Sequence, residues 1–224
     1  SLRLERRADG LTTNNSAPHK MPNNINKYCD PQRPYNKTVE GRYNYVWERI
    51  RLYKEGIDDN LDLNWNLKDA IVSKINFSQK AMDLLLKEKA QIPETFAPIF
   101  DTIYKNGSYN ILDDKGDLHC EGLRIYNICT KWWNIGKPDT EKIYFEHVIP
   151  TNCYLDRLLL LYDNSATIDD FVLLMKNIHV CMVLKEEDKK LNHEFRKTMP
   201  RGWKWGDDPY ARYRVNNIKI WSVL

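Results

Sequence analysis

The chain has 224 residues, of which 42% are hydrophobic and 29% are charged, as is typical of a globular protein with one substantial core or a core and a smaller lobe. No apolar run approaches the ~20 residues that a membrane-spanning helix needs, so the composition argues against a membrane protein. The net charge of +3 is small but uneven, because residues 1–37 carry +4, residues 196–224 carry +5, and the part between them is acidic.

The cysteines and the first residues indicate an intracellular setting. The five cysteines are scattered and include no Cys-x-x-Cys pair, so reduced thiols are the default expectation. The stretch 1–7 has no apolar run behind it that could serve as a secretory signal. We therefore expect a cytoplasmic protein without a membrane partner.

The first half of the chain predicts an irregular arm followed by a helical lobe. Residues 1–40 are basic and rich in Asn, Pro, Thr and Ser, which favours a largely irregular N-terminal arm. Apolar spacing predicts a helix over 43–55, and Ser78 is a good N-cap for a second helix that ends before Pro93. A short helix at 67–75 and a small hairpin at 110–119 complete a lobe that we place at 41–119.

The second half predicts strands separated by helices. Residues 122–135 fit a buried helix, and an apolar, β-prone run ends at Glu146-His147 before Pro150 stops it. Two helices follow, the second opening with a capping box at Thr167. A further strand over 177–184 then leads into a polar helix over 185–194.

Glu146 and His147 form the most informative pair in the sequence. They lie side by side within Ile143-Tyr144-Phe145-Glu146-His147-Val148-Ile149-Pro150. A carboxylate and an imidazole in such an apolar frame require a partner, a metal ion or a proton to move. The pair therefore indicates chemistry at the end of a rigid strand, although a hydrogen-bonded histidine with an acidic neighbour would have the same sequence.

This region resembles the HNH endonuclease superfamily, whose ββα-metal motif begins with Asp-His or Glu-His followed by aliphatic residues and often proline. The resemblance rests on Glu146-His147-Val148-Ile149-Pro150 and, more loosely, on the run from Val183 to Asp188. It implies an α+β fold, mainly helical, with a small ββα-metal unit at 120–200. It also implies that His147 is the general base that takes a proton from the attacking water.

The same resemblance implies one divalent metal ion, Mg²⁺ or Mn²⁺. Glu146, beside the histidine, is the first expected ligand. The second ligand comes from the closing helix and could be Asp188, Asn192 or His193. We favour Asp188, because a second hard oxygen donor facing Glu146 suits magnesium.

Two features of the spacing complete the comparison with this superfamily. The residue that braces the loop between the elements falls on Asn177 or His179. About 40 residues separate His147 from Asp188, which is roughly twice the spacing in compact members of the superfamily. The two intervening helices would therefore be an insertion.

The C-terminal segment 201–224 alternates cations with aromatic residues. Arg201, Lys204, Arg212 and Arg214 could contact DNA phosphates beside the catalytic unit. The tryptophans could equally cover the core while the cations extend outward. The expected substrate is duplex DNA, and restriction, anti-phage and mobile-element roles are all compatible with the pattern.

Two other functions remain open at this level. One is a catalytically inactive nucleic-acid-binding or protein-interaction module on the same fold. The other is a nuclease of a different metal class, for which Asp139 and Glu141 are weak candidates. No Gly-rich phosphate loop or Gly-x-Ser-x-Gly motif points to a small-molecule enzyme.

Overall fold

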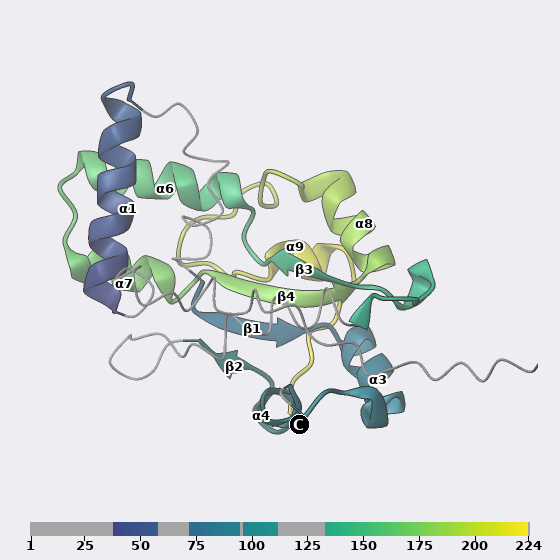
Figure 1. The fold of residues 1–224 in the computed structure, drawn as a ribbon. Coiled ribbons are helices and arrows are strands. Elements are labelled where there is room, and N and C mark those ends of the chain that lie inside the picture. Colours follow the sequence, from purple (N-terminus) through teal and green to yellow (C-terminus); the bar gives the residue numbers. More distant parts are fainter. Residues whose placement is uncertain (1–37, 58–71, 95, 112–132, 224) are drawn as a thin grey trace, which may run out of the picture.

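The computed structural model describes residues 38–57, 72–94, 96–111 and 133–223, which form a mixed α+β fold around a four-stranded sheet (Figure 1). The strand order is β2-β1-β4-β3. The strands are β1 (Lys74–Phe77), β2 (Tyr109–Asn110), β3 (Ile143–His147) and β4 (His179–Leu184). Strand β1 runs parallel to β4, while β2 and β3 are antiparallel to their neighbours. The α+β class expected from the sequence is confirmed.

Helices surround this sheet. They are α1 (Val39–Lys54), α3 (Gln79–Lys87), α4 (Ala97–Asn106), α6 (Thr151–Asp163), α7 (Ile168–Met175), α8 (Lys185–Phe195) and α9 (Ala211–Val215), with 3₁₀ turns η3 (Lys89–Gln91) and η5 (Asp139–Glu141). Helices α6 and α7 lie between β3 and β4 in the chain and pack with α1 to one side of the sheet (Figure 1). Helix α8 follows β4 directly. The expected order of strand, two helices, strand and polar helix is confirmed.

The two faces of the sheet are buried by different parts of the chain. Val180 and Met182 of β4 join the main core, which includes buried residues of α1, α3, α4, α6 and α7. Cys181 and Val183 face the other way and pack with Leu191 of α8 and with the C-terminal segment. Since successive strand residues alternate between faces, each strand residue has a definite side. This alternation positions the candidate site.

Local capping explains where several helices begin. Thr38 accepts a hydrogen bond from the amide of Gly41 at the start of α1 (3.0 Å), and Ser78 accepts one from Ala81 at the start of α3 (3.2 Å). Thr167 and Asp170 form a reciprocal capping box at α7. The N-caps predicted at Ser78 and Thr167 are thus confirmed.

The first part of the sheet differs from the expectation. Residues 74–75, placed in a short helix by the sequence, belong to β1, and the short helix α9 was not expected. Strand β1 has only four residues and is held by pairing with β2 and β4, which are distant in sequence. Such pairing leaves little local signal. Because β1 and β4 adjoin, the expected 41–119 lobe and 120–200 unit share one sheet.

Some expectations fall outside the described residues. These are the N-terminal arm up to residue 37, nearly all of the hairpin at 110–119 and the helix at 122–135 except its last three residues. Among the described helices, none has the length and apolar character to cross a membrane.

Candidate active site

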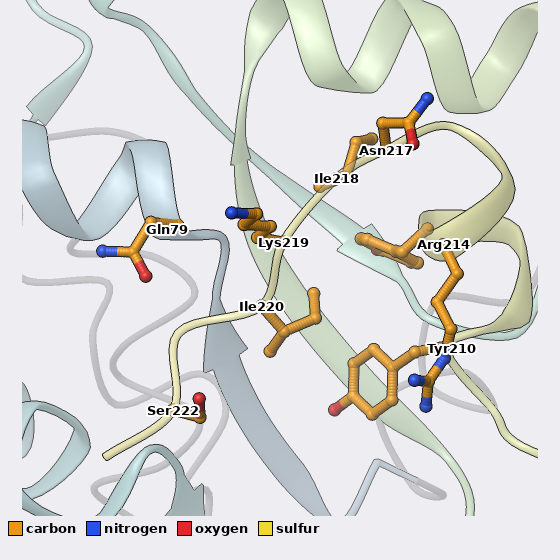
Figure 2. Close-up of a pocket in the computed structure, with 9 residues that line it drawn as sticks. Gln79, Tyr210, Arg214, Asn217, Ile218, Lys219, Ile220 and Ser222 are labelled. Atoms are coloured by element: carbon orange, nitrogen blue, oxygen red, sulfur yellow. The ribbon is translucent and has the colours of Figure 1, made fainter. Parts of the chain in front are cut away.

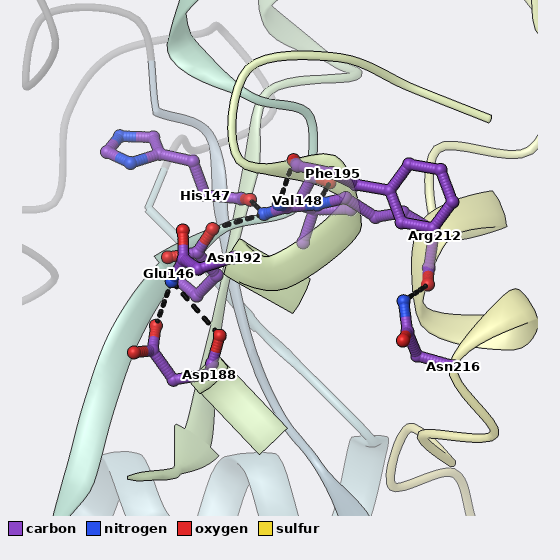
Figure 3. A network of polar contacts seen from close by, with 8 residues as sticks. All are labelled: Glu146, His147, Val148, Asp188, Asn192, Phe195, Arg212 and Asn216. Carbon is purple, nitrogen blue, oxygen red and sulfur yellow. Dashed lines mark hydrogen bonds and ion pairs between the residues drawn. The ribbon is translucent and has the colours of Figure 1, made fainter. Parts of the chain in front are cut away.

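Glu146, Asp188 and Asn192 come together on the α8 side of the sheet (Figure 3). Glu146 is opposite Cys181 in the β3–β4 pair, so it faces α8. Asp188 and Asn192 are four residues apart on α8 and therefore share one side of the helix. The Asn192 side-chain nitrogen donates to Asp188 Oδ1 (2.9 Å) and to its carbonyl oxygen (3.0 Å). The carboxyl groups of Glu146 and Asp188 lie within hydrogen-bonding reach of each other.

This carboxyl pair is unusual in its electrostatics. Burial raises the pKa of Glu146, Arg212 opposes this rise, and the negative charge of Asp188 adds to it. Burial also raises the pKa of Asp188. Two neighbouring carboxylates cannot both ionise without cost unless a cation lies nearby. The pair therefore holds protons more tightly than isolated carboxyl groups and offers hard oxygen atoms to a cation.

Arg212 is a cation that already contacts Glu146. Its guanidinium is fully buried and donates to Glu146 Oε1, to the carbonyl oxygens of His147 and Val148, and to the carbonyl oxygen of Phe195 (Figure 3). The expectation that Arg212 contacts DNA phosphates is therefore wrong. All of its described contacts are internal, because α9 turns this side chain toward the sheet.

His147 lies on the other side of the strand end. It is opposite Val180 in the β3–β4 pair, so alternation turns it away from the face that carries Glu146. Its ring centroid lies 5.9 Å from that of Tyr154 on α6, and Figure 3 shows the ring directed away from Glu146 and Asp188. The imidazole and the carboxyl pair thus flank the end of β3 from opposite faces.

The remaining histidine candidates have separate surroundings. His193 is exposed, and helical spacing turns it away from the side of α8 that carries Asp188 and Asn192. His179 is buried, with Nε2 2.7 Å from the Lys176 carbonyl oxygen and Nδ1 3.1 Å from the Tyr210 hydroxyl. Both nitrogens of His179 are therefore engaged in internal hydrogen bonds.

Asn177, the other residue considered for bracing, follows the C-cap residue of α7. Its side-chain nitrogen donates to the carbonyl oxygen of Leu173 in α7 (3.1 Å). That bond satisfies one of the last carbonyl groups of α7, which have no partner within the helix. Asn177 thus supports the turn between α7 and β4.

The segment that follows α8 presents cations outward. Arg201 and Lys204 are exposed, and the side chain of Arg214 is 73% exposed and forms an ion pair with Asp208 (2.5 Å). Trp203 donates through its indole nitrogen to the Asp208 carbonyl oxygen (3.0 Å). The cations are therefore accessible while Trp203 has an internal role.

A hollow of about 580 Å³ is lined by the C-terminal segment and by Gln79 at the start of α3 (Figure 2). Gln79, Tyr210, Arg214 and Lys219 are among its lining residues, whereas neither Glu146 nor Asp188 contributes to it. Of the site residues predicted from the sequence, Arg214 lines this hollow.

Asp139 and Glu141, considered for the other metal class, form part of η5. Asp139 forms ion pairs with Lys142 (2.8 Å) and Lys185, and these two cations lower the pKa of its carboxyl group to about 2. The carbonyl oxygen of Glu141 accepts a hydrogen bond from the Trp133 indole (2.9 Å). These contacts join η5 to the start of α8 and give Asp139 a structural role.

The donor set around Glu146 suits one small divalent cation. Across the described ranges, no three His, Cys, Asp or Glu side chains form a group that could hold a metal ion. The set here consists of two carboxylates and an amide, and magnesium is commonly held by one or two carboxylates with water as the other ligands. In ligand type alone, Glu146, Asp188 and Asn192 are compatible with Mg²⁺ or Mn²⁺.

Two partners were not predicted from the sequence: Arg212, which contacts Glu146, and Tyr210, which contacts His179. A signal for either would have required the position of α9, which no local pattern gives. Comparison with known proteins adds no candidate, since no family model, curated protein or solved structure matches this chain.

Proposed function

We propose that this protein is a metal-dependent endonuclease of the HNH type that hydrolyses phosphodiester bonds in DNA, with duplex DNA as its substrate. The observation that carries the proposal is that Glu146, near the end of β3, and Asp188, in the first turn of α8, lie next to each other. Two neighbouring acids in a partly buried position lower the free energy of unfolding, so stability does not explain their presence. A cation-binding role accounts for the arrangement.

Glu146, Asp188 and Asn192 would hold one Mg²⁺ or Mn²⁺ ion. When bound, such an ion neutralises charge that develops on a phosphate and on the leaving oxygen. Because the carboxyl groups hold their protons tightly, binding of the ion would release protons and would be weaker at acidic pH. Asn192, held by its bonds to Asp188, would offer its amide oxygen.

His147 would act as the general base. Imidazole accepts protons near neutral pH and can activate a water molecule for attack on phosphorus. His147 is the last residue of β3, so strand pairing holds its backbone in place. The ring of Tyr154 lies beside the imidazole. Because His147 and the carboxyl pair lie on opposite faces of β3, this mechanism requires a phosphate that reaches around the end of the strand.

The exposed cations after α8 would bind the substrate. Arg201 and Lys204 extend outward, and Arg214 is exposed despite its ion pair with Asp208. Cations of this kind neutralise phosphates without reading the base sequence. They would bind DNA next to the strand end.

The test is cleavage of supercoiled plasmid DNA by the purified protein with Mg²⁺ or Mn²⁺. We expect His147→Ala to reduce the rate by about 10²–10⁴-fold, the usual contribution of a general base. Glu194→Gln, an exposed change on α8, is the matched control and should keep the wild-type rate. Undiminished cleavage by a folded His147→Ala variant would contradict the mechanism.

A catalytically inactive binding module is the second candidate. It is favoured by Arg212, which already supplies a positive charge to Glu146 in place of a metal ion. Calorimetric titration distinguishes the two functions. DNA binding without detectable Mg²⁺ or Mn²⁺ binding would support the inactive module, whereas metal binding that is lost in Asp188→Asn would support the nuclease.

A further inference from the structure

We propose that Arg212 is a positioning residue of the candidate site, which holds the Glu146 carboxylate toward α8 and fixes the backbone that carries His147. The inference rests on the proposed function, because it concerns the same metal ligands and the same base. Arg212 itself would touch neither the metal ion nor the substrate. It would act through the two residues that do.

The contacts of Arg212 join three consecutive residues of the strand end. One Nη atom donates both to Glu146 Oε1 and to the His147 carbonyl oxygen, and Nε donates to the Val148 carbonyl oxygen (2.8 Å). A guanidinium is planar and its donors are rigidly spaced. One side chain therefore sets the direction of the Glu146 carboxylate and of the peptide groups on both sides of Val148.

The same guanidinium also reaches the far end of α8. Its other Nη atom donates to the Phe195 carbonyl oxygen (3.0 Å), which belongs to the last turn of the helix, where carbonyl groups have no helical partner. Asp188 and Asn192 lie on this helix. Arg212 thus connects the strand that carries Glu146 with the helix that carries the other two proposed ligands.

Burial shields the ion pair between Arg212 and Glu146 from solvent. Arg212 is fully buried, and the side chain of Glu146 is 18% exposed. Water and salt therefore compete weakly with the ion pair. Without Arg212, the Glu146 carboxyl group would lose the guanidinium that holds it in this orientation beside Asp188.

Substitution of Arg212 by lysine distinguishes a positioning role from the effect of positive charge alone. Arg212→Lys keeps one positive charge, but an ammonium group lacks the fork that bonds the carbonyl oxygens of His147, Val148 and Phe195 at once. If only charge mattered, this variant would behave as wild type. If the fork positions the site, the charge-conserving variant should still be impaired.

The experiment measures Mn²⁺ affinity by electron paramagnetic resonance and DNA cleavage kinetics in the full chain. We expect Arg212→Lys to weaken Mn²⁺ binding by about 10- to 100-fold, the usual effect of losing a residue that orients metal ligands. The kcat for plasmid cleavage should fall, while the KM for DNA stays within about twofold, because uniform binding of the substrate is untouched. Arg51→Lys, which alters an exposed arginine paired with Glu48 and Glu55 on α1, is the matched control.

Chemical rescue adds a readout that a purely structural residue would not provide. In Arg212→Ala, millimolar methylguanidinium should restore part of the Mn²⁺ affinity, whereas methylammonium and sodium chloride should not. The same addition should leave Glu146→Gln unchanged. Should Arg212→Ala fail to fold, Arg212→Lys carries the test.

The outcomes separate this inference from the proposed function. Wild-type protein that binds Mn²⁺ and cleaves DNA, together with an Arg212→Lys variant that does both equally well, would overturn the positioning role alone. Wild-type protein that binds no Mn²⁺ would remove the proposed function and the positioning role with it. Impaired Mn²⁺ binding in Arg212→Lys with an unaffected Arg51→Lys would support the inference.

Discussion

His179 is held as a neutral imidazole inside the protein. Its Nε2 donates to the Lys176 carbonyl oxygen, which leaves Nδ1 to accept from the Tyr210 hydroxyl, and Tyr210 in turn accepts from the Asn76 side-chain nitrogen. Burial is the main cause that lowers the pKa of His179 from 6.5 to about 4. This chain of hydrogen bonds ties the start of β4 to β1 and to the C-terminal segment.

This neutral histidine predicts a loss of stability in acid. Between pH 6.5 and 4 the unfolded chain binds a proton at His179 and the folded protein does not, so the free energy of unfolding falls as the pH falls. At 1.36 kcal/mol per pKa unit, the loss is at most about 3 kcal/mol at pH 4. Urea unfolding at pH 7 and pH 4.5 measures it.

His179→Gln provides the comparison for this prediction. The variant should lose about 2 to 3 kcal/mol less than wild type between the two pH values, because glutamine does not titrate. The raised pKa values of Glu146 and Asp188 act in the opposite direction in both proteins and cancel in the difference. Equal losses in the two proteins would show that His179 does not cause the acid sensitivity.

At the scale of elements, the three acids in the first turn of α8 make different contacts and so have different roles. Glu186 forms an ion pair with Lys80 at the surface. Glu187 is buried and accepts hydrogen bonds from the Leu184 amide (3.0 Å) and from the Ser78 hydroxyl (2.6 Å). Asp188 faces Glu146. Acids favour a helix N-terminus in general, but only the packing of α8 on the sheet separates these three tasks.

The capping box of α7 predicts a measurable contribution to stability. Thr167 accepts from the Asp170 amide (3.4 Å), and Asp170 accepts from the Thr167 amide (2.9 Å). Thr167→Ala should lower the free energy of unfolding by ~1 kcal/mol, as loss of an N-cap usually does. Thermal unfolding checks this. The control for the loss of a threonine is Thr102→Ala within α4, where the hydroxyl donates to the Pro98 carbonyl oxygen and caps no helix. A variant as stable as wild type would show that the main core, and not the cap, sets the start of α7.

At the scale of the whole molecule, positive charge is concentrated in the first 37 residues and in the segment after α8. Residues 196–224 carry a net charge of +5, and Arg201 and Lys204 are exposed there. Under the proposed function, these exposed cations would contribute to the attraction of DNA. Because Cys153 on α6 hydrogen-bonds to the Lys197 carbonyl oxygen (3.6 Å), the segment is also attached to the helix that follows His147.

This charge distribution predicts how DNA binding depends on salt. Arg201→Ala and Lys204→Ala should each weaken binding to DNA of any sequence and reduce the slope of log Kd against log salt concentration by about 1. Lys105→Ala, an exposed change on α4, is the charge-matched control and should leave the slope unchanged. Fluorescence anisotropy at several salt concentrations measures it. Equal slopes for all four proteins would remove these two cations from the binding surface.

The local pattern of residues determined α1, α3 and most of the elements from β3 onward. The helix caps at Ser78 and Thr167, the strand ending at Glu146-His147 and the polar helix after β4 follow from short-range signals, because capping and side-chain periodicity act within a few residues. The pairing of Glu146 with α8 was anticipated through a family resemblance, and the fold brings these residues together.

Only the tertiary structure decided the rest. Arg212 and Arg214 are two residues apart and were read alike, yet one is fully buried against Glu146 and the other is exposed. Strand β1 exists through its pairing with β2 and β4, and the sides taken by Glu146 and His147 follow from the register of β3 on β4. Burial, long-range pairing and ion pairs depend on which distant segments come into contact. Local sequence patterns do not determine those contacts.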